Sequence, residues 1–134
     1  MSNMEKVTEF LTKAKTFYFL TTDGDQPRGR PFSFFDVKDG RLVFGTGAHK
    51  DVCKQMEKNP KVEVKATNGA KFLRMDGTVE FFEDAAFAAA VREKYPYMSK
   101  LYNEETGLKQ VFFYLNGVRV QIINGFTLVE EFAI

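Results

Sequence analysis

The 134-residue chain contains no tryptophan, one cysteine and one histidine. A single cysteine cannot form an internal disulfide, and Cys53 together with His49 supplies too few ligands for a structural zinc site. The net charge is +1, so no long-range field would draw the chain to nucleic acid or to a membrane surface. The start of the chain lacks the apolar run of a signal peptide, and no segment approaches the roughly 20 apolar residues of a membrane helix. A cytoplasmic location is therefore expected.

Motifs of common catalytic sites are missing as well. The chain has no nucleophile-elbow serine, no Walker loop and no dinucleotide-binding fingerprint. Cys53 lies on the apolar stripe of an expected helix with Val52 and Met56, so it is interpreted as a core residue and not as a nucleophile. A chain without an acid-base set of its own favours a protein whose cofactor performs the chemistry.

Phenylalanine is the residue in excess, with 15 in the chain, and several are adjacent, as in Phe34-Phe35, Phe81-Phe82 and Phe112-Phe113. Neighbouring residues of a strand point to opposite faces of a sheet, so each pair places a ring on both sides. This pattern predicts a sheet that is covered on both faces. Its own core would cover one face, and a partner subunit or a flat ligand would cover the other.

Changes in hydrophobic period divide the chain into short strands and helices within one domain, residues 1–134. Ser2 and Glu5 have the spacing of a capping box, and Asp84 is placed to cap a later helix. Strands are expected over residues 16–22, 28–38, 41–46, 62–66, 71–82, 110–115, 118–123 and 126–132. Helices are expected near the start of the chain and over residues 47–60, 84–94 and 98–102.

These short strands in hairpin order predict a mainly β fold with flanking helices, in which one antiparallel sheet rolls into a barrel. Closure of that barrel would also protect the strand edges. On the strand 71–82, Phe72 lies on the mostly polar face beside Arg74. Its ring is therefore expected outside the barrel core.

The segment from Phe44 to Asp51 is the first candidate site. It leads from a strand through small residues into a helix, where free backbone N–H groups, the Thr46 hydroxyl and the cations His49 and Lys50 form a cradle suited to phosphate. A lysine at a helix N-terminus opposes the macrodipole unless an anion lies nearby. Asp51 could be that anion, so a self-compensated surface turn stays open as the alternative.

The segment from Arg28 to Phe34 is the second candidate, because Arg28, Arg30, Phe32 and Phe34 share one face of a strand. A guanidinium beside aromatic rings and a serine hydroxyl suits a phosphorylated ligand that carries a ring. Solvated edge arginines followed by core phenylalanines are the alternative interpretation.

With these segments in this order, the chain resembles the FMN-binding split-barrel family of pyridoxamine 5'-phosphate oxidase-like proteins, in its short branch. The likeness covers almost the whole chain and is carried by FYFLTTDGDQPRGRPFSF, LVFGTGAHKDVCKQMEKNPKVEV, KFLRMDGTVEFFED and VFFYLNGVRVQII. The resemblance implies an antiparallel six-stranded split β-barrel that pairs into a homodimer, with FMN bound at the interface between the two copies.

The resemblance also implies cofactor contacts on three segments, namely Arg30, Pro31, Phe32, Ser33, Gly45, Thr46, His49, Lys50, Phe72 and Arg74. Arg30 would contact the phosphate or the ribityl chain, Thr46 and Lys50 would hold the phosphate, and His49 takes the place of a commonly basic neighbour. Phe32 and Ser33 would lie beside the isoalloxazine ring. The segment from Phe72 to Arg74 would cover that ring from the partner chain.

The implied activity is FMN-dependent oxidoreduction of an unknown small molecule. The family's namesake oxidase ends in an Arg- and His-bearing segment that binds the pyridoxal substrate, whereas this chain ends in GFTLVEEFAI. Oxidation of pyridoxamine phosphate itself is therefore not expected. Two alternatives stay open, namely a non-catalytic barrel that binds a flavin, haem or single-stranded nucleic acid, and the same barrel with a deazaflavin.

Overall fold

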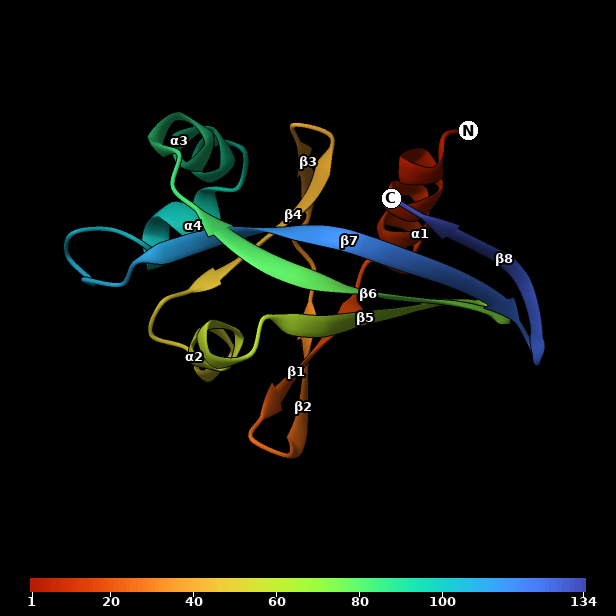
Figure 1. Ribbon diagram of the computed structural model, residues 1–134. Coiled ribbons are helices and arrows are strands. Elements are labelled where there is room, and N and C mark those ends of the chain that lie inside the picture. The colour runs from red at the N-terminus through yellow and green to blue at the C-terminus, as the bar shows by residue number, and fades with distance from the viewer.

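The computed structural model describes all of residues 1–134 as a strongly curved antiparallel sheet with four helices around it (Figure 1). The elements are α1 (Asn3–Ala14), β1 (Phe17–Asp23), β2 (Gln26–Phe32), β3 (Asp36–Lys38), β4 (Arg41–Gly47), α2 (Asp51–Lys58), β5 (Lys61–Asn68), β6 (Lys71–Phe82), α3 (Ala85–Lys94), α4 (Pro96–Leu101), β7 (Gln110–Asn124) and β8 (Thr127–Ala133). Hydrogen-bonded neighbours follow the order β2-β1-β5-β6-β7-β4-β3, and β8 pairs with β7. The predicted mainly β, antiparallel fold is confirmed.

Two helices begin as their capping residues predict. The Ser2 hydroxyl accepts a hydrogen bond from the Glu5 backbone N–H at 3.1 Å, and the Ser2 N–H donates to the Glu5 carboxylate at 3.2 Å, which completes the capping box of α1. Asp84 caps α3 by accepting from the Phe87 N–H at 3.0 Å. In contrast, α2 begins after Lys50, whose side chain makes no capping hydrogen bond. The start of α2 therefore keeps backbone donors without a side-chain partner.

The strand expected over residues 28–38 is in fact two strands, β2 and β3. The β1–β2 ladder ends where Phe17 pairs with Phe32, and β3 then pairs with β4, with Asp36 opposite Val43. Residues 33–35 belong to neither strand and lead the chain from one end of the sheet order to the other. The prediction missed this break because the apolar alternation continues through it.

The sheet curls without closing, so the expected closure of the barrel is wrong for this chain. β2 and β3 occupy the two ends of the strand order and do not pair with each other. In Figure 1 the β1–β2 hairpin projects below the body and the β3–β4 hairpin projects above it. With β3 and β8 as separate strands, the sheet has eight strands where the resemblance implies six. The opening between β2 and β4 is the split of the barrel.

Residues 110–124 form one long strand, β7, although a turn was expected at Asn116-Gly117. The β6–β7 register shifts between Asp76 and Thr78, and Gly117 has a φ of 59°, so these residues form a bulge within a continuous ladder. The bulge bends both strands. It also brings Gly77 so close to β7 that a Cβ there would lie 2.8 Å from the Asn116 carbonyl oxygen.

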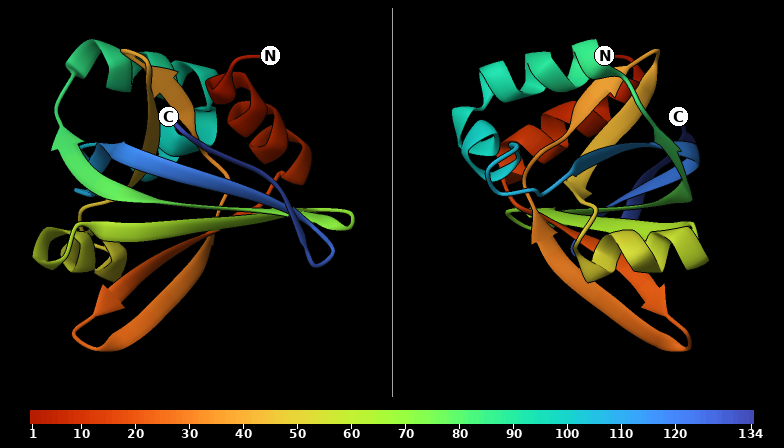
Figure 2. Two further views of the ribbon diagram at one scale, coloured as in Figure 1. Left: turned by 45° about the vertical axis from the view of Figure 1, so that its right-hand side comes forward. Right: turned by 90° about the vertical axis from the view of Figure 1, so that its left-hand side faces the viewer.

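Both faces of the sheet are buried around β4 and β7, as the phenylalanine pairs predict, but the second cover differs from the one expected. Phe113 is buried in the main core inside the curl, while Phe112 is buried on the outer face. There Phe112 packs edge-to-face on Phe87 of α3, with ring centroids 5.1 Å apart. This chain's own α3 and α4, shown above the sheet in Figure 2, cover that face, and no partner or ligand is needed.

Replacement of Gly77 by alanine tests the bulge. We expect Gly77→Ala to lower the free energy of unfolding by about 1–3 kcal/mol, because the methyl group would overlap the Asn116 carbonyl oxygen and the Leu115 side chain. Urea unfolding followed by circular dichroism measures this change. Thr78→Ala, at an exposed neighbouring position, is the control and should stay within about 0.5 kcal/mol of the parent. Equal midpoints for both variants would contradict the close packing at the bulge.

Candidate functional site

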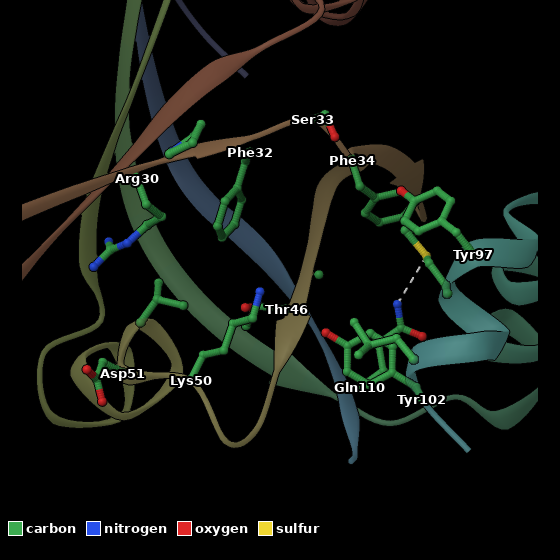
Figure 3. Close-up of a pocket in the computed structure, with 15 residues that line it drawn as sticks. Arg30, Phe32, Ser33, Phe34, Thr46, Lys50, Asp51, Tyr97, Tyr102 and Gln110 are labelled. Carbon is green, nitrogen blue, oxygen red and sulfur yellow. Dashed lines mark hydrogen bonds between the residues drawn. The ribbon is translucent and has the colours of Figure 1, made fainter. Parts of the chain in front are cut away.

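A cleft of about 560 Å³ lies at the split of the barrel, between β2 and the free edge of β4 (Figure 3). The first residue of β3, Asp36, pairs with Val43 of β4. From Phe44 to Gly47, β4 therefore pairs only with β7. The cleft is lined by Arg30, Pro31, Phe32, Ser33, Phe34, Gly45, Thr46, Lys50, Asp51, Val52, Tyr97, Met98, Leu101, Tyr102 and Gln110. Its volume falls within the range of about 300–1,000 Å³ that is typical of small-molecule sites.

Most of the predicted site residues meet in this cleft. β2 and the residue after it supply Arg30 to Ser33, β4 supplies Gly45 and Thr46, and the start of α2 supplies Lys50. The two candidate segments are therefore parts of one site. In Figure 3 the Lys50 side chain extends toward Thr46 and Phe32.

The Arg30 guanidinium is held partly by the protein itself. Its Nη1 donates to the Phe19 carbonyl at 3.1 Å and to the Thr21 hydroxyl at 2.7 Å, and its Nη2 donates to Gln55 Oε1 at 2.9 Å. Burial is the main cause that lowers the pKa of Arg30, with a smaller effect of Arg28. A guanidinium has about five N–H donors, so about two remain for an external acceptor. Arg30 is thus a braced cation whose head is turned toward α2, as Figure 3 shows.

The Thr46 hydroxyl is one of two buried polar groups of the cleft that lack a hydrogen-bond partner. Thr46 is only 6% exposed, and its Oγ1 has no hydrogen-bond partner. Leaving such a group unpaired costs roughly 1–3 kcal/mol, and buried hydroxyls are normally paired. Thr46 lies on the last part of β4, where the neighbouring strand β3 has already ended. An incoming ligand can supply the missing partner at this position.

One side of the cleft was not foreseen from the sequence. α4 contributes Tyr97, Met98 and Leu101, Tyr102 follows it, and the first residue of β7 contributes Gln110. The only signal in the sequence was the expectation of a short helix there, with no hint of what it would face. α4 reaches the cleft because α3 and α4 pack on the outer face of β4 and β7, which places the end of this helical pair at the split.

His49 lies beside the cleft and does not line it. Its side chain is exposed, and its ring sits against Gly47, where an added Cβ would lie 2.6 Å from His49 Nδ1 and 3.1 Å from the Tyr102 hydroxyl oxygen. Gly47 therefore has to lack a side chain for His49 and Tyr102 to approach the strand. The predicted role of His49 at the phosphate stays a prediction.

Phe72 and Arg74 lie far from the cleft of their own chain. Phe72 pairs with Ile123 near one end of β7, whereas Gln110 begins the other end. The stretch of β7 from Gln110 to Ile123 measures roughly 40 Å along the strand. Arg74 Nε donates to Gln121 Oε1 at 2.6 Å on the same distant part of the sheet. Phe72 and Arg74 therefore do not line the cleft of their own chain, and their predicted role at the cofactor stays a prediction.

Cys53 is buried, as its position on the apolar stripe predicts. Burial and a hydrogen bond from its Sγ to the Glu57 carboxylate at 3.3 Å raise the pKa of the thiol to about 11. The thiol is therefore protonated near neutral pH and is a poor nucleophile. Nowhere in the structure do three His, Cys, Asp or Glu side chains gather in a way that could hold a metal ion.

An open antiparallel barrel with a partly cationic cleft at its split defines a split-barrel protein. A sequence model of the pyridoxamine 5'-phosphate oxidase family matches residues 4–122, so the chain belongs to this family. The resemblance seen in the sequence is thereby confirmed. A comparison with curated proteins found no match, and no helix of the chain is long and apolar enough to cross a membrane.

Solved structures share the fold over the full length of the chain. A NimC/NimA family protein from Clostridium acetobutylicum is 29% identical with a TM-score of 0.87, covering 100% of this chain and 95% of that one. General Stress Protein 26 from Bacillus anthracis is 19% identical with a TM-score of 0.72 and full coverage of both chains. A heme binding protein from Mycobacterium smegmatis is 15% identical with a TM-score of 0.70, and the alignment covers 99% of this chain and 58% of that one.

Replacement of Thr46 by valine tests whether its hydroxyl is kept for a ligand. We expect Thr46→Val to raise the free energy of unfolding of the ligand-free protein by about 1–2 kcal/mol, because an unpaired buried hydroxyl becomes a methyl group of similar shape. Urea unfolding provides the measurement. Thr21→Val is the matched control, since Thr21 is equally buried but bonded to Arg30 and Gln55, and it should lose about 1–3 kcal/mol. Equal destabilisation by both would argue against an unsatisfied Thr46.

Proposed function

We propose that the cleft binds FMN at an interface between two copies of the chain, and that the protein is an FMN-dependent oxidoreductase acting on a small molecule. The observation that carries the proposal is the unpartnered Thr46 hydroxyl, which lines the same cleft as Lys50 in a chain of this family. A hydroxyl can both donate and accept a hydrogen bond. When it is buried without a partner beside a cation, it suits an anionic ligand that carries hydroxyl groups.

The residues of the cleft fit the phosphate of this cofactor on one side. Lys50 supplies a charge without an ion-pair partner within the chain, and α2 begins there without a side-chain cap, so its first N–H groups suit an anion. Arg30 adds its remaining donors from β2. Asp51 also lines the cleft, and its negative charge partly offsets these cations.

The residues along the split fit the flat ring. Phe32 and Pro31 provide apolar surface, Gly45 lines the cleft without a side chain, and Ser33 adds a hydroxyl. Backbone N–H and C=O groups alternate along a strand edge, and they match a heteroaromatic ring that carries donors and acceptors on its rim. Bound flavin supplies reversible transfer of a hydride or of single electrons. The chain would bind the ring, orient it and exclude water from one side.

A second copy would complete the site. The rim of the cleft carries Tyr97 and Leu101, which are 58% and 41% exposed, and apolar side chains at a rim suit an interface. We place Phe72 and Arg74 of the partner at this rim, because they are too distant within one chain. The Tyr102 hydroxyl is kept protonated, since burial raises the pKa of this group, so it can act as a donor near the ring.

The absorption spectrum of the freshly purified protein tests the cofactor. We expect flavin absorption, and mass analysis of the ligand released by heat should give FMN. A haem spectrum would contradict FMN and would favour the ligand class named for the Mycobacterium smegmatis structure. Salt-dependent binding of an oligonucleotide by a colourless protein would instead favour a nucleic-acid module.

Lys50→Ala tests the phosphate assignment. We expect FMN to bind about 10- to 100-fold more weakly, because a charge-assisted hydrogen bond is lost. Fluorescence titration with FMN measures the dissociation constant. Lys54→Ala is the control, since Lys54 is exposed one helical turn further along α2 and does not line the cleft. An unchanged affinity for FMN in Lys50→Ala would remove Lys50 from the phosphate site.

Phe72→Asp tests the contribution of the partner. We expect the dimer and FMN binding to weaken together, because the charge would lie at an apolar contact between copies. Sedimentation velocity and FMN titration give the two readings. Thr78→Asp, an exposed position on the same strand, should leave both unchanged. A stable dimer with full FMN affinity in Phe72→Asp would show that this segment lies outside the interface.

A further inference from the structure

The two sides of the cleft differ in charge. Its charged residues, Arg30, Lys50 and Asp51, all come from β2 and the start of α2. The opposite side consists of Phe34, Tyr97, Met98, Leu101, Tyr102 and Gln110, and we call these six residues the α4 compartment. It contains aromatic and aliphatic side chains, two phenolic hydroxyls and one carboxamide. A ligand group that enters the α4 compartment meets no ionised side chain there.

The carboxamide oxygen of Gln110 has no hydrogen-bond partner within this compartment. This oxygen, Oε1, is buried, and Nε2 of the same carboxamide donates only to the Met98 thioether sulfur at 3.3 Å. Sulfur of this kind is a weak acceptor. Gln110 begins β7 opposite Gly47 at the end of the β4–β7 ladder, so its backbone position is fixed by the sheet. A fixed amide with an unpaired oxygen is suited to accept a hydrogen bond from a ligand.

The walls of the compartment favour a flat ligand. Phe34 packs edge-to-face on Tyr95, with ring centroids 5.7 Å apart, and on Phe112 at 6.1 Å, which fixes its orientation. Tyr97 is 58% exposed on the outer rim. In Figure 3 Phe34 and Tyr97 lie together above Gln110 and Tyr102. Aromatic rings on more than one side of a polar anchor suit a planar molecule that stacks or packs edge-on.

We propose that the α4 compartment binds an uncharged, planar small molecule with an N–H or O–H donor, and that Gln110 selects this molecule by accepting a hydrogen bond from its donor. The proposal names the substrate class of the proposed oxidoreductase. It depends on that proposed function only in calling the bound molecule a substrate. A phosphorylated or carboxylated molecule is disfavoured, because its charge would lose water without gaining a cation. Gln110 is a specificity-determining residue in this account and takes no part in bond making.

Indole is a suitable probe because the protein contains no tryptophan. The fluorescence of indole therefore reports the probe alone when it is excited beyond the tyrosine band. Indole, 1-methylindole and indole-5-carboxylate share one ring system and differ in the donor and in charge. Each is titrated into the purified protein as isolated, with its flavin content read from visible absorbance, and into the variants Gln110→Met and Gln26→Met. Gln26 is the control, being exposed in the β1–β2 hairpin and outside the cleft.

We expect the parent protein and Gln26→Met to bind indole about three- to tenfold more tightly than 1-methylindole, which is the range that one net hydrogen bond provides. Indole-5-carboxylate should bind at least about tenfold more weakly than indole. In Gln110→Met, a variant of similar length, the preference for indole over 1-methylindole should fall to about one. Affinity for 1-methylindole should stay the same or rise.

Several results would overturn the proposal. An unchanged indole preference in Gln110→Met, tighter binding of the carboxylate, or no binding of any probe would each do so. These outcomes are separate from the cofactor proposal. If the protein carries FMN and Gln110→Met leaves the preference unchanged, this inference fails and the flavin assignment stands. If no flavin is present and the preference still depends on Gln110, the flavin assignment fails and the binding specificity stands.

Discussion

The functional features of this protein depend on the inability of β2 and β3 to pair with each other. The chain leaves the β1–β2 ladder at Phe32, crosses through residues 33–35 and re-enters the sheet at its other end, which keeps the curl open. Because β3 ends opposite Val43, the last part of β4 has a neighbour on one side only. The same opening exposes a strand edge and forms the cleft in which we propose that a ligand binds, with a rim that a second copy would cover. A closed barrel of this size would have filled that space with side chains.

Unsatisfied polar groups mark the two halves of the opening. Thr46 and Gln110 lie on adjacent strands at the same end of the sheet, and each holds a buried oxygen without a partner. The Thr46 half is cationic because β2 and α2 deliver Arg30 and Lys50 to it, while the Gln110 half is neutral because α4 covers it. Stability is given up at both positions, and binding can recover it where a ligand completes the hydrogen bonds. The division suits a charged cofactor tail on one side and a neutral reactant on the other.

Much of the local structure could be predicted, because it rests on interactions between residues close in sequence. The Ser2–Glu5 capping box, the Asp84 cap and the Asp39-Gly40 turn, where both residues have positive φ, form as their spacing indicates. The errors arose where distant strands decide the outcome. Asn116-Gly117 has the composition of a turn, yet it became a bulge because β6 pairs with β7 on both sides of it. Phe112 gained its cover from α3, a contact that no local pattern encodes.

The sequence alone determined the mainly β antiparallel fold, the capped starts of α1 and α3, the family and two of the segments that line the cleft, since these follow from periodicity, capping chemistry and motif order. Only the tertiary structure decided that Arg30 is braced by Thr21 and Gln55, that Thr46 lacks a partner, and that α4 faces Gln110. The physical reason is the sequence separation between the residues that interact. Caps and turns are set by bonds across a few residues, whereas the satisfaction of a buried polar group depends on which distant side chains packing brings within about 3 Å of it.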